Sequence, residues 1–179
     1  MEIIDEPKRW YALKVFFNKT DALIKKIDVE DIETYIPMHT VEKYDSKGLH
    51  YEEKPLIHSL MFIRCRESWL LSFKRKNYND FMFYKAAEEY RPGPIDDEEM
   101  RIFILVTSAD KGKGLGYLGS DESGFKTGQR VRVIKGIYKG AEGYIKRIKK
   151  DRKLIVSVSG VAVVAVSYIP PEFLEKIED

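Results

Sequence analysis

The chain has 179 residues, of which 44% are hydrophobic, enough apolar material for one modest core or two small ones. Its single cysteine excludes an internal disulfide framework and a cysteine-based zinc site, and its three histidines lack metal-ligand spacing. The sequence has no run of about 18 apolar residues, and residues 1–10 lack a signal-peptide core, so we expect a soluble, cytoplasmic protein without a cofactor.

Strand and helix patterns alternate between residues 10 and 106. Strands are predicted over residues 10–16, 34–44, 49–54, 60–66 and 81–85, and helices over residues 19–31, 67–76 and 96–106. Pro37 interrupts the second strand because proline cannot donate a ladder hydrogen bond. Acidic residues begin the last helix, where the helix dipole favours negative charge. This order predicts an α+β fold with a four-stranded antiparallel sheet and helices packed on it.

The segment from Ala109 to Thr127 differs from its surroundings. It is rich in glycine, has no period and carries no net charge, which is typical of a flexible linker. Its glycines do not lead into Gly-Lys-Ser/Thr at the start of a helix, so a phosphate-binding loop is not expected. Tyr117, Leu118 and Phe125 are more apolar than a spacer needs, which would suit docking on a domain. The predicted domains are residues 1–109 and 128–179, joined by the linker 110–127.

A small β domain is predicted after this linker. Val131 and Val133 alternate with arginines, as on a strand with one buried face, and Gly136, Gly140 and Gly143 mark a tight turn. Further strands are predicted over residues 144–148, 154–159 and 161–169. This is the layout of a small barrel, and it resembles the KOW motif.

Basic charge is concentrated in that C-terminal domain. Residues 128–179 carry 11 lysines and arginines against 6 acidic residues, a net charge of +5, whereas residues 1–109 carry −3. Such an excess favours an anionic partner by long-range attraction, but it is small for a nucleic-acid-binding domain. The run KRIKKDRK at residues 146–153 is therefore either a solvated hairpin tip or a contact for phosphates.

No arrangement of side chains points to catalysis. His58 and Ser59 are adjacent on an extended chain, so their side chains point to opposite faces and cannot form a nucleophile–base pair. Cys65 is in phase with Met61 and Ile63 on one strand face, which predicts a buried apolar side chain. We therefore do not expect an enzyme.

The N-terminal part resembles the N-terminal domain of the NusG family of transcription factors. The resemblance rests on RWYALKVF (9–16), ETYIPMHTVEK (33–43), KPLIHSLMFIRC (54–65) and RPGPIDDEEM (91–100), which occur in the family's order. The chain is most similar to the specialised, operon-restricted paralogues of the UpxY and RfaH types. It departs from the family in having Ile57-His58-Ser59-Leu60 where Phe-Pro-Gly-Tyr is common, and in its short first helix.

The resemblance implies a mechanism and the residues that carry it. An apolar depression would bind the largest subunit of RNA polymerase, and it aligns with Phe16, Ile57, Leu60 and Phe62. The region that lies against non-template DNA in the specialised paralogues aligns with Lys74, Arg75 and Lys76. The KOW domain would recruit a small-subunit ribosomal protein or the helicase Rho, through Tyr138, Lys139, Lys146 and Arg147. We expect a monomer.

Each of these assignments has an alternative. The four apolar residues could form ordinary sheet core, and the three basic residues could cap a helix C-terminus. At the level of function, the chain could instead be a KOW-type RNA-binding or ribosome-associated protein that does not touch polymerase, or a scaffold whose N-terminal sheet binds an unrelated pair of helices.

Overall fold

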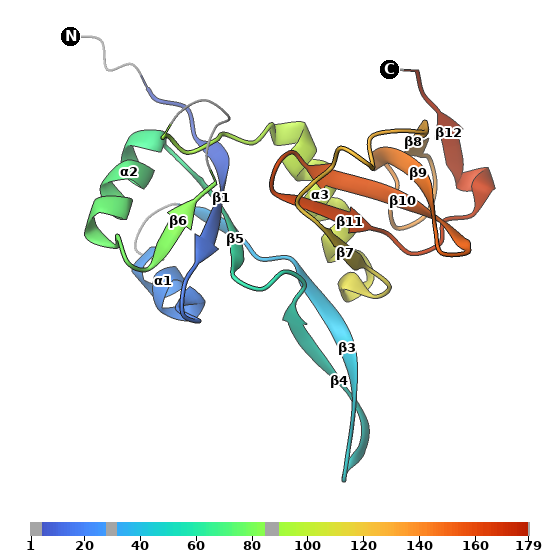
Figure 1. The fold of residues 1–179 in the computed structure, drawn as a ribbon, viewed down its shortest axis with the longest axis horizontal. Helices are drawn as coiled ribbons and strands as arrows, with labels where there is room; N and C mark the ends of the chain where they lie inside the picture. Colours follow the sequence, from blue (N-terminus) through green and yellow to red (C-terminus); the bar gives the residue numbers. More distant parts are fainter. Residues whose placement is uncertain (1–4, 28–31, 85–89, 179) are drawn as a thin grey trace. The chain divides into compact units, whose positions relative to one another are not determined.

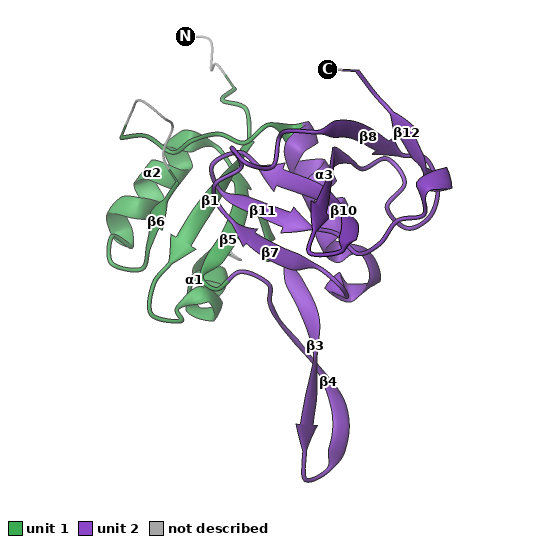
Figure 2. Cartoon of the chain, turned by 45° about the vertical axis from the view of Figure 1, so that its right-hand side comes forward, with its two compact units in different colours: residues 1–36, 58–97 green, residues 37–57, 98–179 purple. Residues whose placement is uncertain are grey.

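The computed structural model describes residues 5–27, 32–84 and 90–178 (Figure 1). The chain divides into two compact units, and neither is one continuous stretch (Figure 2). The first unit contains residues 1–36 and 58–97, and the second contains residues 37–57 and 98–179. No helix in the described part of the chain is long and apolar enough to cross a membrane.

The first unit is built on a four-stranded antiparallel sheet. Its strands are β1 (Arg9–Val15), β2 (Glu33–Tyr35), β5 (Leu60–Cys65) and β6 (Phe81–Phe83), in the order β2-β5-β1-β6. The central pair, β1 and β5, runs in register from Arg9 opposite Cys65 to Lys14 opposite Leu60. The predicted sheet is therefore confirmed, and β1 is bonded on both edges.

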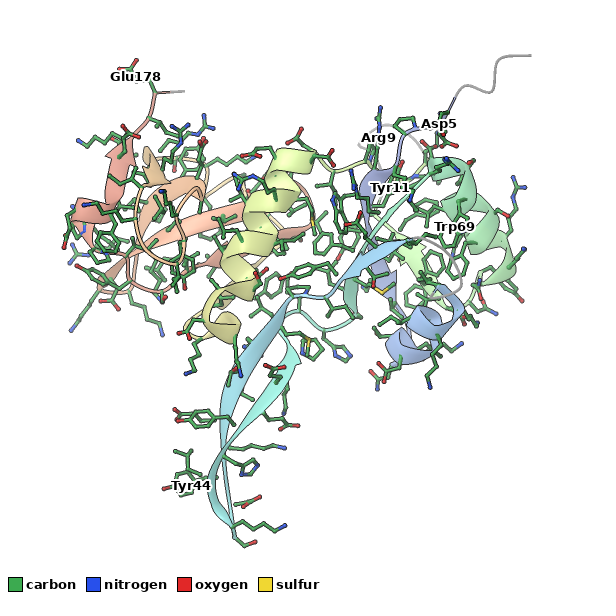
Figure 3. All side chains as sticks on the ribbon, turned by 180° about the vertical axis from the view of Figure 1, so that it is seen from behind. Asp5, Arg9, Tyr11, Tyr44, Trp69 and Glu178 are labelled. Atoms are coloured by element: carbon green, nitrogen blue, oxygen red, sulfur yellow. The ribbon has the colours of Figure 1, made fainter. Side chains whose placement is uncertain are left out.

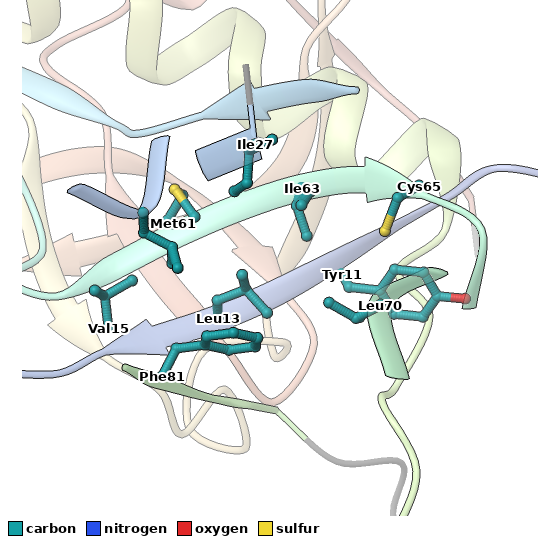
Figure 4. Close-up of a cluster of buried hydrophobic side chains, with 10 residues drawn as sticks. Tyr11, Leu13, Val15, Ile27, Met61, Ile63, Cys65, Leu70 and Phe81 are labelled. Atoms are coloured by element: carbon teal, nitrogen blue, oxygen red, sulfur yellow. The ribbon is translucent and has the colours of Figure 1, made fainter. Parts of the chain in front are cut away.

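Two helices, α1 (Thr20–Ile27) and α2 (Glu67–Lys76), bury one face of this sheet. The buried cluster contains Tyr11, Leu13, Val15, Leu23, Ile27, Met61, Ile63, Cys65, Leu70 and Phe81 (Figure 4). Around it, the ring of Phe73 stacks on Trp69, with 4.7 Å between centroids, and on Phe81, with 5.7 Å. Odd-numbered positions of β1 supply this core because alternate side chains of a strand share a face.

One carboxylate links α1 to the loop between α2 and β6. Asp80 accepts hydrogen bonds from Lys19 Nζ at 2.7 Å and from Lys26 Nζ at 2.8 Å. The hydrogen bonds from Lys19 and then Lys26 lower the pKa of Asp80 to about 2. Since the ordinary pKa of aspartate is near 4, this carboxylate favours the folded state at neutral pH.

We expect Asp80→Asn to be less stable than the wild type at pH 7, because the ionised form that both lysines bind is gone. A group with a lowered folded pKa stabilises above its unfolded pKa and loses that effect as the pH falls through the folded value. The stability difference should therefore shrink between about pH 4 and pH 2, as measured by urea unfolding at each pH. Asp110→Asn, an exposed carboxylate, is the control. A difference that is constant over this range would contradict the role of Asp80.

The second unit contains a six-stranded antiparallel sheet. Its strands are β7 (Gly116–Gly119), β8 (Gln129–Val133), β9 (Glu142–Ile148), β10 (Asp151–Val158), β11 (Ala162–Ala165) and β12 (Leu174–Lys176), in the order β12-β8-β9-β10-β11-β7. The predicted C-terminal β domain is therefore confirmed. Gly143 is required where β9 passes β10, since a Cβ there would collide with the carbonyl oxygen of Ile155.

The segment predicted as a flexible linker differs from that prediction. Within it, β7 pairs with β11, from Gly116 opposite Ala165 to Gly119 opposite Val163. Leu118 and Phe125 pack against the cluster of Ile155, Val163 and Ala165, so these two apolar side chains dock on the C-terminal sheet. A glycine-rich segment without a period contains no local signal for a strand such as β7. Backbone hydrogen bonding to an open sheet edge needs no particular side chain, so the strand can form there.

The second unit also holds one helix and a hairpin. Two hydrogen bonds join helix α3 (Asp97–Ser108) to the C-terminal sheet. Glu99 Oε1 accepts from Ser159 Oγ at 2.6 Å, and Arg101 Nη2 donates to Gly140 O at 3.2 Å. The hairpin pairs β3 (Met38–Asp45) with β4 (Gly48–Pro55), and exposed Tyr44 lies near its tip (Figure 3). The compact units thus do not coincide with the predicted domains, since α3 was assigned to the N-terminal one.

Candidate functional site

The face of the first sheet that α1 and α2 leave uncovered carries two of the four residues predicted to bind polymerase. Leu60 lies opposite Lys14, and Phe62 lies opposite Ala12, so both side chains share this face. Leu60 and Phe62 are buried, and the Phe62 ring lies 6.5 Å from that of Tyr35. At the same end of the face, Lys14 and Met82 are opposite each other and exposed.

Phe16 lies just beyond the end of β1. Its side chain is half-buried, and its backbone N–H donates to Asp80 O at 2.8 Å. The next residue, Phe17, is 85% exposed and has a φ of 53°, a left-handed conformation that is costly for a bulky side chain. Sequence reasoning missed Phe17. The available signal was the following Asn18, whose residue type tolerates that conformation and which also adopts it, with a φ of 55°.

Ile57 is 7% exposed and belongs to the second unit, whereas the other three apolar residues belong to the first. Of the four residues, only Phe16 has a partly exposed side chain. The structure therefore brings Leu60 and Phe62 together on one face of the first sheet, with Phe16 just beyond the end of β1. A carboxylate introduced at Ile57 or Leu60 would be buried without a partner, so such a substitution tests the fold before it tests binding.

The three basic residues at the end of α2 differ in their surroundings. Lys74 Nζ donates to the backbone oxygens of Tyr78, at 2.7 Å, and Phe81, and lies 4.9 Å from the centre of the Phe81 ring. Partial burial lowers the pKa of Lys74. Arg75 and Lys76 are exposed. Lys74 therefore ties the end of α2 to the segment that leads into β6, whereas the side chains of Arg75 and Lys76 are accessible to solvent.

We expect Lys74→Ala to lower the free energy of unfolding by about 1–3 kcal/mol, because it leaves two backbone oxygens without a charged donor. Arg75→Ala and Lys76→Ala are the matched controls, one and two positions further along the same helix end, and should change stability by less than about 0.5 kcal/mol. Urea unfolding at pH 7 measures all three. Equal effects at the three positions would mean that Lys74 has no special structural role.

Two of the four residues predicted to contact a partner of the C-terminal domain, Tyr138 and Lys139, lie in the loop between β8 and β9. Tyr138 is only 6% exposed, and its hydroxyl lies 3.1 Å from Ser167 Oγ. The backbone N–H of Ala141 donates to Tyr138 O at 2.9 Å, which closes the loop. Tyr138 therefore packs inside the domain. Its neighbour Ile137 is 60% exposed and points to solvent from the same loop.

The other predicted contact residues are more accessible. Lys139 and Arg147 are exposed. Lys146 donates from Nζ to Thr127 Oγ1 at 2.5 Å, which ties the hairpin to the segment just before β8. Lys139 lies two positions after Ile137 in the loop, whereas Arg147 lies on β9 and lines a cavity with residues of other strands. The four predicted residues thus do not form one surface.

Titratable groups in the first core are shielded from water. Burial raises the pKa of Cys65 to about 12 and that of Tyr11 to about 12. Cys65 is therefore held as a thiol in the cluster, as the strand pattern predicted. Among residues 5–27, 32–84 and 90–178, no three His, Cys, Asp or Glu side chains are grouped so that they could hold a metal ion.

Comparisons with known proteins agree with this architecture. Residues 8–104 match the family described as "Transcription termination factor nusG". A solved structure described as "Domain interaction in Thermotoga maritima NusG" aligns with 96% of this chain and 98% of that chain, with a TM-score of 0.51 and 19% sequence identity. At that identity the likeness concerns the fold. No curated protein matches the sequence.

Proposed function

The chain belongs to the NusG family of transcription factors, and from that premise we propose that it binds RNA polymerase through its N-terminal sheet and recruits a second partner through its KOW-like C-terminal sheet. In this role it is a transcription elongation and antitermination factor that acts in the cytoplasm. The observation that carries the proposal is the family match over residues 8–104, which spans all four strands of the first sheet. The finer assignment to the operon-restricted paralogues stays a prediction.

The polymerase-binding surface that we propose is the face of the first sheet that contains Leu60 and Phe62, together with Phe16 at its end. An apolar face suits a contact with helices of the largest polymerase subunit, because desolvated apolar side chains supply most of the energy of such interfaces. Leu60 and Phe62 are themselves buried. Exposed Lys14 and Met82 on the same face would be contacted first. Ile57 stays a predicted member of the surface.

A weaker contact with non-template DNA is proposed at the end of α2. Arg75 and Lys76 are exposed and can approach phosphates, whereas Lys74 is occupied by backbone oxygens. Two phosphate contacts would add a modest, salt-dependent contribution to attachment on an elongation complex.

The C-terminal partner surface is proposed to centre on the β8–β9 loop. Ile137 offers an exposed apolar side chain and Lys139 an exposed charge in the same loop, while Tyr138 supports the loop from inside. A small-subunit ribosomal protein and Rho are the two candidate partners.

The polymerase proposal is tested with two buried leucines, Leu60 on the proposed face of the sheet and Leu70 on helix α2, which packs against the opposite face. Leu60→Ala and Leu70→Ala should each cost about 2–5 kcal/mol of stability, since each leaves a cavity. We expect Leu60→Ala to weaken binding of purified RNA polymerase core enzyme about tenfold or more by biolayer interferometry. Leu70→Ala should bind like the wild type at a temperature where circular dichroism shows both variants folded.

Phe16→Ala, at a half-buried position, should weaken polymerase binding with a smaller loss of stability. If Leu60→Ala and Leu70→Ala reduced polymerase affinity equally, the loss would reflect general destabilisation and the proposed face would be wrong. Undetectable binding of the wild-type chain to polymerase would remove the proposed function itself.

For the C-terminal partner, we expect Ile137→Ser to lower the affinity of the full chain for the purified small ribosomal subunit, or for Rho, about tenfold. Tyr138→Phe should keep that affinity within twofold and cost about 0.5–1.5 kcal/mol of stability, because it removes one hydrogen bond inside the domain. Tyr117→Ser, at an exposed position on β7, is the control. Loss of binding in Tyr138→Phe but not in Ile137→Ser would place the contact on Tyr138, as the family resemblance implied.

A further inference from the structure

A cavity of about 440 Å³ opens on the C-terminal sheet, away from the β8–β9 loop. Strands β8, β9, β10 and β12 and the segment 168–171 form its walls. Val131, Ile145, Leu154 and Leu174 provide an apolar lining, and all four lie on one face of the sheet. The cavity lies entirely within the second unit and is the size of a typical small-ligand site.

Positive charge gathers at one end of this cavity. Arg147 and Arg152 line it and are directly opposite each other on β9 and β10. Like charges in that position destabilise an antiparallel pair, and both side chains are exposed. Within the described part of the chain, neither arginine has an acidic partner, whereas Arg130 and Arg132 on β8 both pair with Glu142. Lys176 adds a third cation at the wall formed by β12.

The opposed arginines are suited to an anion. Two planar guanidinium groups can each donate two hydrogen bonds to a phosphate, which would convert the like-charge contact into a binding site. Beside the cavity, Tyr168 is 67% exposed, while the adjacent Ile169 is buried and holds the segment in place. An exposed aromatic ring next to a cationic end is the combination that binds a base and its phosphate.

We infer that this cavity binds one nucleotide of a single-stranded nucleic acid, with the base against Tyr168 and the apolar lining and the phosphate between Arg147 and Arg152. Lys149 and Lys150, in the turn between β9 and β10, would attract the neighbouring phosphates. A duplex does not fit, because its bases are stacked inside and cannot enter a concave site. An acidic peptide would pair with the two arginines but would place no apolar or aromatic group against the Tyr168 ring and the apolar lining.

This inference rests on the cavity and its charges and is independent of polymerase binding. It gives Arg147 a nucleic-acid contact in place of the protein contact that the family resemblance implied. It also separates two surfaces of one domain, since the loop with Ile137 is not part of the cavity.

The test uses the full chain and fluorescein-labelled ten-nucleotide strands of mixed sequence, one RNA and one DNA, with anisotropy measured from low to physiological salt. Arg147→Gln/Arg152→Gln should weaken binding about tenfold or more and reduce the magnitude of the salt slope by about 0.7, since the two arginines share one phosphate and each phosphate contact on a single strand contributes about 0.7. Tyr168→Ala should weaken binding about tenfold at an unchanged slope, and Tyr168→Phe should bind like the wild type.

Lys47→Gln/Lys135→Gln removes two exposed cations outside the cavity and is the control for net charge. The double arginine variant should melt at or above the wild-type temperature, because removal of the opposed charges relieves repulsion. Binding of either RNA or DNA strands supports the inference, and the comparison of the two shows which sugar is preferred. Equal losses in the control, equal affinity for a duplex, or preference for a Glu- and Tyr-rich peptide over both strands would overturn it.

Discussion

The pairing of β1 with β5 is the constraint on which the first unit depends. The register from Arg9 opposite Cys65 to Lys14 opposite Leu60 decides which side chains face α1 and α2 and which face away. Because side chains alternate along a strand, a slip of one residue would exchange the two sets. Such a slip would turn Lys14 or Arg64 from the uncovered face into the helix-covered core, where a charged side chain has no partner. The core and the proposed polymerase surface are therefore determined by the same pairing.

The same constraint explains why the loops at one end of this sheet are well defined. Backbone hydrogen bonds join Val15 to Ser59 and Phe16 to Asp80, so the ends of three strands are connected outside the ladder. Asp80 adds its two lysine contacts at this point. Such a network can maintain the left-handed conformation of Phe17 and keep its ring exposed. Exposed aromatic side chains held by a rigid frame are suited to recognition, because little entropy is lost on binding.

In the C-terminal sheet, the buried residues that stabilise the fold are distinct from the exposed arginines proposed to bind a ligand. Strand β11 is buried at every position, and Gly143 allows close approach of β9 and β10. Beyond this core, the β9–β10 hairpin places two arginines opposite each other at a cost in stability. A sequence selected for stability alone would avoid such a pair, and departures of this kind are expected where a protein binds a ligand. One domain can thus offer a loop to one partner and a cavity to another.

The sequence by itself determined most elements and the family. Period-2 alternation identified the strands, Pro37 marked the break between β2 and β3, and the Trp10-Tyr11 start and the glycine pattern around Gly143 supported the resemblance that the comparisons confirm. These features are local, so they can be read from neighbouring residues.

Only the tertiary structure decided how side chains with the same local pattern are used. Strand β7 exists because the edge of β11 accepts it, although the two are separated by more than forty positions in the chain. Tyr138 is buried while its neighbour Ile137 is exposed. In the same way, the Lys74 ammonium donates to backbone oxygens while the side chain of Arg75 is exposed to solvent. Contacts with other segments of the chain decide which of two neighbours is covered. The opposition of Arg147 and Arg152 depends on strand register, and the cavity beside them is closed by β12 and residues 168–171. Local patterns specify secondary structure, whereas exposure and pairing depend on contacts between residues that are far apart in sequence.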